Sequence, residues 1–167
     1  DGGATGRSLD GWQMNDFRNQ IAHSDARGTI EMVTSLRRFD VSDNERWRDI
    51  GVLHARGTQA EFEAAEALCR EGLVQSRILG AEILAQLGWG EPTFVDASVD
   101  ILLMLLADSQ PSVIAAAGVA LGHRNSPRAI EPALTLVSHH CSEVRFGAVS
   151  ALSRHDNVAA IRGLITL

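Results

Sequence analysis

The stretch RFGAVSAL at residues 145–152 decides the fold, because two earlier segments of the chain repeat its pattern. Residues 77–84 (RILGAEIL) and 114–121 (IAAAGVAL) superpose on it without a gap. The fourth position is always glycine or alanine and the eighth always leucine: Gly80, Ala117 and Ala148, then Leu84, Leu121 and Leu152. The repeat is about 31 residues long, with a longer first interval around residues 89–92, and residues 48–51 (RDIG) form an earlier copy.

These two columns of the repeat, the small residues at the fourth position and the leucines at the eighth, have a physical reason. Helices reach the short end of their usual spacing, about 8–10 Å, only where the facing side chains are very small. The leucines then fill the space between neighbouring helix pairs. A single pair is too small to bury its own apolar face, so stacked pairs must supply the core. The sequence therefore predicts an all-α fold, an α-solenoid of stacked antiparallel helix pairs.

Capping and breaking residues predict where the helices begin and end. Thr58 and Glu61 have the spacing of a capping box, so a helix should follow Thr58 and reach about Gly72. The other helices are expected to begin near Ser42, Ser76, Glu91, Pro111, Ser126, Ser142 and Asn157, and to end near Gly57, Gly88, Asp108, Gly122, His139, Arg154 and Leu167, respectively.

The chain is expected to hold one domain. Residues 1–8 (DGGATGRS) are glycine-rich and polar, so they predict a disordered lead-in, and residues 9–167 form a single repeat domain. Ile161, Leu164 and Ile165 have helical spacing and leave an apolar stripe uncovered. We therefore expect the domain to be truncated at its C-terminal end.

Composition excludes several enzyme classes. All 15 basic residues are arginine. A chain without lysine cannot form a lysine Schiff base or supply the lysine of a phosphate-binding loop. Cys69 and Cys141 lie far apart outside any CxxC motif, which favours small buried side chains in a reducing compartment. The longest apolar run, residues 101–107, is too short to cross a bilayer. A cytoplasmic protein is expected.

The net charge of −6 is concentrated in the middle of the chain. Residues 61–110 hold nine acidic residues against two arginines, Arg70 and Arg77. This balance argues against nucleic acid as a ligand, because phosphate binding relies on a basic stripe. It suits a basic protein partner, and the alternative is a solvated face that maintains solubility.

Two segments resemble a known repeat. Residues 143–152 (EVRFGAVSAL) and 126–134 (SPRAIEPAL) are similar to HEAT repeats, in the short form associated with phycobilin lyase subunits. The resemblance covers about residues 25–167 and implies a solenoid whose second helices line a concave face. Residues 46–88, with the RGT turn at 56–58, look most like small bacterial HEAT-repeat proteins, some of which act as immunity proteins that block toxins.

The sequence holds no residue pattern that favours a catalytic or metal site. Three consecutive residues, 139–141 (HHC), cannot all point at one ion, and a helix-capping role is expected for them. Asp96 and Asp100 share a helix face that should meet water. Residues 47–49 (WRD) are of the types that DNA glycosylases of related architecture use. The acidic middle of the chain, however, has the wrong charge for a DNA-binding groove. No metal, cofactor or membrane partner is predicted, and no residue marks a tetrapyrrole site.

Interaction residues are predicted instead. Trp47, Arg48 and Arg77 are candidate rim anchors, because tryptophan and arginine dominate interface hot spots. Phe146 is expected beside an apolar trough whose small residues include Ala115, Gly118 and Gly122. Structural packing is the alternative for the anchors, and cover by the next helix pair is the alternative for Phe146.

The acidic residues Glu61, Glu63 and Glu66 form a second candidate contact. Together these observations predict a non-catalytic protein-interaction scaffold, and its specific form is an immunity protein that neutralises a basic bacterial toxin domain. The alternative is a bilin lyase or chaperone that attaches a cofactor. The sequence leaves open whether the concave face or the acidic edge binds the partner.

Overall fold

The computed structural model describes residues 11–38 and 43–155 of the chain. The expected lead-in at residues 1–8 and the expected last helix from Asn157 lie outside the described residues. The described helices are α1 (Gly11–Ala22), α2 (Thr29–Leu36), α3 (Asp43–Arg56), α4 (Gln59–Cys69), α5 (Val74–Leu84), α6 (Val95–Leu105), α7 (Pro111–Arg124), the 3₁₀ turn η1 (Pro127–Ala129), α8 (Ile130–Leu134) and α9 (Ser142–Leu152).

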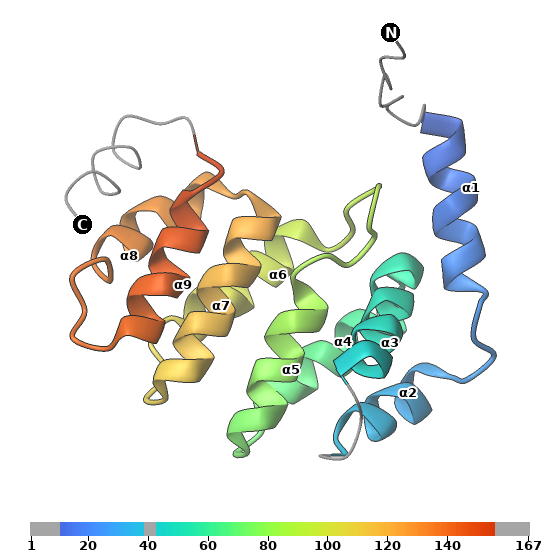
Figure 1. The fold of residues 1–167 in the computed structure, drawn as a ribbon, viewed down its shortest axis with the longest axis horizontal. Coiled ribbons are helices and arrows are strands. Elements are labelled where there is room, and N and C mark those ends of the chain that lie inside the picture. The colour runs from blue at the N-terminus through green and yellow to red at the C-terminus, as the bar shows by residue number, and fades with distance from the viewer. Residues whose placement is uncertain (1–10, 39–42, 156–167) are drawn as a thin grey trace, which may run out of the picture.

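The helices form two layers, as the repeat predicts. Each first helix packs on the second helix of its own pair, giving α2/α3, α4/α5, α6/α7 and α8/α9. The second helices α3, α5, α7 and α9 also pack on one another in order, and α1 extends their row by packing on α3 (Figure 1). The first helices α2, α4, α6 and η1 make the opposite layer. The fold is an all-α, HEAT-like solenoid.

The two predicted columns are buried. The leucines Leu84, Leu121 and Leu152 are 0% exposed, so they fill the space between pairs as expected. Gly80 meets the first helix of its own pair, because a Cβ atom there would lie 2.6 Å from Cys69 Sγ and 2.8 Å from the Ala65 carbonyl oxygen. The small-residue column therefore sets the close approach of α5 to α4.

Most predicted boundaries agree with the structure within a few residues. The capping box is confirmed: the Thr58 hydroxyl accepts from the Ala60 N–H, and the Glu61 carboxylate accepts from the Thr58 N–H at 3.0 Å. The helix expected from Glu91 begins later, at Val95, because Phe94 has a left-handed backbone with φ of 50°.

The helix expected to reach His139 was predicted too long. It ends at Leu134, and the chain continues in tight turns in which Leu136 N–H donates to the Ala133 carbonyl. The Leu136 and His139 N–H groups donate to carbonyls three residues back, as in tight turns, and not four residues back, as in an α-helix.

The trough predicted from Ala115, Gly118 and Gly122 is wrong, because α9 covers these residues. A Cβ atom on Gly118 would lie 2.4 Å from the Gly147 carbonyl oxygen, and one on Gly122 would lie 2.3 Å from the Ser150 carbonyl oxygen. These small residues bring the backbones of α7 and α9 into contact. The open face of α7 is formed by the residues that come about one position after these in the sequence.

Candidate functional site

Three hollows of about 310, 180 and 250 Å³ adjoin along the row of second helices. Trp47 and His54 line the first and second, and Ala85 and His123 line the second and third. Gln86 lines all three. The hollows therefore form one continuous depression, here called the groove, which crosses α3, α5 and α7.

The middle of the groove is apolar. Ala116, Val119 and Ala120 of α7 line it together with Ala85, which directly follows α5, and the Trp47 side chain stands at its α3 edge. Trp47 is 55% exposed although it borders two of the three hollows. A large exposed aromatic ring beside small apolar side chains is a surface that a partner's apolar side chain can bury.

The floor of the groove is tied together at the C-terminal end of α5. His54 Nε2 lies 2.8 Å from the Glu82 carbonyl oxygen, and because a carbonyl only accepts, the imidazole donates from this nitrogen. The last carbonyls of a helix have no intrahelical donor and need an outside partner. His54, which belongs to α3, supplies one to α5.

Arg124 of α7 approaches the same end of α5 from the other side. Its Nε donates to the Leu84 carbonyl oxygen at 2.6 Å, and its Nη1 donates to the Leu87 and Thr93 carbonyl oxygens at 3.3 Å each. The residue is 8% exposed. Burial lowers the pKa of this guanidinium to about 10, so it remains charged at neutral pH. The end of α5 is thus held by both neighbouring helices.

The loop between α5 and α6 is fixed against the end of α3. The backbone N–H groups of Gly88 and Trp89 both donate to the His54 carbonyl oxygen, at 2.8 and 3.1 Å. Gly57 has a φ of 54°, and a Cβ atom on it would lie 2.4 Å from the Gly88 nitrogen. The loop therefore makes a rigid wall of the groove, with Trp89 in edge contact with Phe17 of α1, ring centroids 5.8 Å apart.

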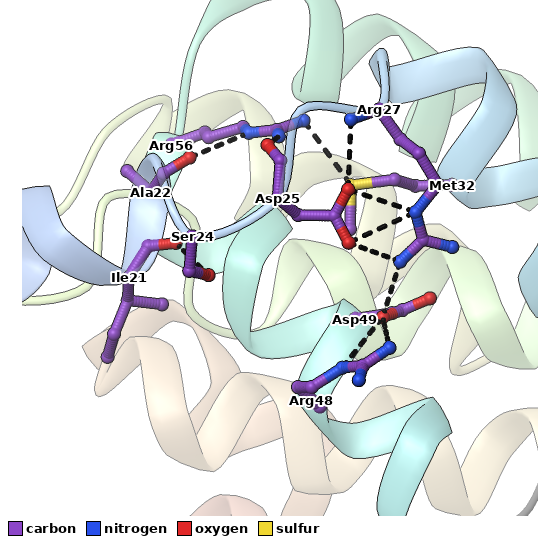
Figure 2. Close-up of polar contacts among 9 residues, drawn as sticks. All are labelled: Ile21, Ala22, Ser24, Asp25, Arg27, Met32, Arg48, Asp49 and Arg56. Carbon is purple, nitrogen blue, oxygen red and sulfur yellow. Dashed lines mark hydrogen bonds and ion pairs between the residues drawn. The ribbon is translucent and has the colours of Figure 1, made fainter.

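A network of charged residues anchors the segment between α1 and α2 to α3 (Figure 2). Arg27 donates to both Asp25 carboxylate oxygens and, at 2.8 Å, to Asp49, which is 2% exposed. The side-chain hydrogen bonds from Arg27 hold the pKa of Asp25 well below its usual range. Arg56 adds hydrogen bonds to the Ala22 and Asp25 carbonyls. Both carboxylates of this network are paired with arginines, and the network is structural.

A fourth hollow, of about 410 Å³, lies between α3 and α5 on the side of Leu36 and Leu73. Arg46 at its edge pairs with Glu82 across the two helices, and Arg37 pairs with Glu71, with one contact at 3.0 Å. Because these cations are already neutralised by acidic neighbours, the hollow offers less to a ligand than the groove.

Two of the predicted anchors have structural contacts. Arg77 binds Asp108 through two hydrogen bonds of 2.7 and 3.1 Å and also donates to the carbonyls of Glu71 and Gly72. It joins two successive repeats, and its side chain is 14% exposed. Arg48 donates to Asp49 at 3.1 Å, but its side chain is 64% exposed. Trp47 alone among the three lines the groove.

The predicted acidic face divides in two. Glu61 is 2% exposed and accepts hydrogen bonds from Thr58 and Thr29, so a partner cannot reach its carboxylate without opening the cap. Burial opposes the ionisation of Glu61, but these hydrogen bonds outweigh it and lower its pKa. Glu63 is exposed and Glu66 is half-buried, both on α4 in the opposite layer from the groove. Glu61 is therefore not part of the exposed acidic surface.

Phe146 is 64% exposed but does not line the groove hollows. In the repeat, Phe146 corresponds to Ala115 of α7, and Ala115 contacts Gly147 of α9. By this correspondence Phe146 lies on the edge of α9 that faces away from α7.

The sequence interpretation missed His54, His123 and Arg124 as groove residues. Each lies near the end of a second helix, which is where basic side chains commonly cap carbonyl groups. That signal indicates a cap, but it does not say which neighbouring helix supplies the carbonyls.

Acid should weaken the fold through His54. Burial is the main reason that the His54 pKa falls to about 4, from an ordinary value of 6.5. Between these values the unfolded chain binds a proton that the folded chain does not, so stability falls as the pH falls. Because of His54, we expect the free energy of unfolding to fall by about 2 kcal/mol between pH 7 and pH 5. Urea unfolding at both pH values measures the loss.

The control for this prediction is His54→Gln, whose side-chain amide also donates to a carbonyl but does not titrate. Between pH 7 and pH 5, the unfolding free energy of this variant should fall by about 2 kcal/mol less than that of the unmodified chain. Equal pH dependence of the two proteins would mean that His54 is protonated in the fold.

Among the residues that the structure describes, no group of three or more His, Cys, Asp or Glu side chains is placed to hold a metal ion. Nor do the described helices include one with the length and apolar character needed to span a membrane.

Comparison with known proteins points the same way as the repeat analysis. Residues 99–167 match the family model of HEAT repeats. The match takes in most of α6 and all of α7, η1, α8 and α9. A search of curated proteins finds no match to the chain.

Proposed function

We propose that this HEAT-like solenoid is a non-catalytic scaffold that binds a partner protein along the groove. The observation that carries the proposal is Trp47, a large aromatic side chain that is 55% exposed at the edge of two hollows. The match to HEAT repeats supports an interaction role, because stacked repeats offer an extended binding surface.

The groove is suited to binding because its floor is already ordered. His54 and Arg124 hold the end of α5, and the α5–α6 loop is fixed to α3 by backbone hydrogen bonds. A partner would therefore spend little free energy on ordering this surface. Buried aromatic anchors at the centre of an interface commonly contribute about 2 kcal/mol or more.

The specific form of the proposal is an immunity protein that neutralises a basic toxin domain. The acidic side chains that favour such a partner are exposed in the opposite layer, where Glu63 lies on α4 and Asp96 and Asp100 lie on α6. Opposite charges would speed association and fix orientation. The groove and this acidic surface are two separate candidate contacts for the toxin domain, so each needs its own variants in the binding test.

The test uses the full chain as bait in an extract of the organism that encodes it, followed by titration calorimetry with the purified partner. We expect Trp47→Ala to weaken binding at least tenfold. The matched control is Ile30→Ala, which removes another exposed apolar side chain but in the layer opposite the groove. It should leave the affinity within twofold.

The other outcomes decide between the candidate functions. A partner that is insensitive to Trp47→Ala but lost with Glu63→Arg and Glu66→Arg contradicts the groove and assigns binding to the acidic surface. A toxin domain whose activity the chain inhibits supports the immunity role. A pigment protein that gains a bilin only with this chain present contradicts the scaffold role and supports the lyase alternative.

A further inference from the structure

The groove is basic at the end that lies next to α9. Its third hollow, of about 250 Å³, is lined by His123, Arg124 and Arg154 together with the loop residue Trp89. No aspartate or glutamate is among its lining residues. Three basic side chains from two successive repeats therefore meet without an acidic neighbour in the hollow.

The arginines here differ from most others in the described part of the chain. Arg18, Arg27, Arg37, Arg46, Arg48, Arg70, Arg77 and Arg128 all form ion pairs with carboxylates. Among the described residues, neither Arg124 nor Arg154 has such a partner, and Arg124 binds only carbonyl and hydroxyl oxygens. In a chain with a net charge of −6, this is an unneutralised positive site.

The charges act on one another. The pKa of His123 is lowered, first by burial and then by the charge of Arg154. The charges of Arg124 and His123 likewise contribute to the low pKa of His54, after its burial. An anion placed in the hollow would be attracted by the guanidinium groups of Arg124 and Arg154 and would favour the protonated form of His123.

The donors present fit a carboxylate. The backbone N–H groups of Gly88 and Trp89, which could otherwise help to cradle a phosphate, already donate to the His54 carbonyl. Arg124 has one of its five N–H groups left after its four hydrogen bonds, and Arg154 is exposed with its planar donor pair available. Guanidinium groups bind carboxylates through paired hydrogen bonds.

Resting on the proposed function, we propose that the hollow of His123, Arg124 and Arg154 binds an aspartate or glutamate side chain of the partner protein. The same partner segment places apolar residues against Trp47 and Val119 in the adjoining part of the groove. The basic hollow thereby fixes the direction in which the segment lies. The acidic opposite layer and the net negative charge disfavour a polyanion such as nucleic acid in this role.

The experiment selects random twelve-residue peptides by phage display on the full chain and measures each selected peptide by fluorescence anisotropy. We expect selected peptides to combine apolar residues with an acidic residue at a fixed spacing from them. Arg154→Glu should weaken their binding at least tenfold. Arg128→Glu, the same charge change at an exposed arginine near the opposite layer, is the matched control and should change binding less than twofold.

A charge exchange completes the test. Changing the acidic residue of the peptide to glutamine should cost the same tenfold, and Arg154→Glu should then add no further loss. A peptide with lysine at that position should bind Arg154→Glu better than the unmodified chain. Circular dichroism checks that each variant keeps its helices.

The outcomes separate this inference from the proposed function. Peptides that depend on Trp47 but show no acidic preference, or that are insensitive to Arg154→Glu, overturn the carboxylate site and leave the scaffold role standing. Selection that yields no peptide dependent on Trp47 contradicts both. Enrichment of basic peptides also overturns the inference.

Discussion

Replacing Arg124 with methionine is expected to lower the free energy of unfolding by about 3 kcal/mol. Methionine keeps much of the side-chain volume but donates no hydrogen bond, so the carbonyls of Leu84, Leu87 and Thr93 lose a donor in the interior. The loss is smaller than the sum of three bonds, because burial of the charged guanidinium itself opposes folding. Chemical denaturation of the purified variant measures the change.

Two further substitutions define the cause of that loss. Arg128→Met removes an exposed arginine whose partner Asp100 is also exposed, so it should change stability by less than about 0.5 kcal/mol. Arg124→Lys keeps the charge but not the planar donor pattern and should lie between the other two variants. If Arg124→Met proves as stable as Arg128→Met, the carbonyls at the end of α5 find other partners.

Gly118→Ala is expected to destabilise the fold by about 2–3 kcal/mol. The added Cβ atom would lie 2.4 Å from the Gly147 carbonyl oxygen and 2.8 Å from Gly147 Cα, and backbone atoms cannot rotate away. The helices α7 and α9 must therefore separate along their whole contact. Thermal and urea unfolding of the variant measure the effect.

The control is the same substitution in another helix. A Cβ atom on Gly51, inside α3, would meet nothing within 4 Å. Alanine is the better helix former, so Gly51→Ala should stabilise the protein by roughly 0.5–1 kcal/mol. Opposite signs for the two variants are the expected result. A gain in stability at Gly118 would show that α7 and α9 do not approach as closely as described.

The sequence predicted the parts of the fold that depend on neighbouring residues. The capping box at Thr58 and the start of α7 at Pro111 follow from short-range chemistry, and the structure confirms both. The repeat columns also predicted the buried positions, because each helix must turn its apolar stripe inward. The buried leucines such as Leu121 confirm this.

The groove depends on long-range contacts, which a helical pattern does not contain. A pattern shows that Gly118 is on a small-residue face, but not that α9 covers this face and leaves Val119 open. The helix α1 was not predicted either. Its Phe17 contacts Trp89 and its Arg18 pairs with Glu91, both more than 70 residues away in the chain.

The shared end of α5 has a consequence for how the protein unfolds. Repeat arrays tend to unravel from their ends, because each repeat depends mainly on its nearest neighbours. Here the carbonyls of Glu82 and Leu84 obtain side-chain donors only when α3 and α7 are both docked. Losing either neighbour leaves polar groups of α5 unpaired, so the three pairs α2/α3, α4/α5 and α6/α7 should open as one cooperative block. Amide protons throughout this block would then exchange with solvent at a common, slow rate.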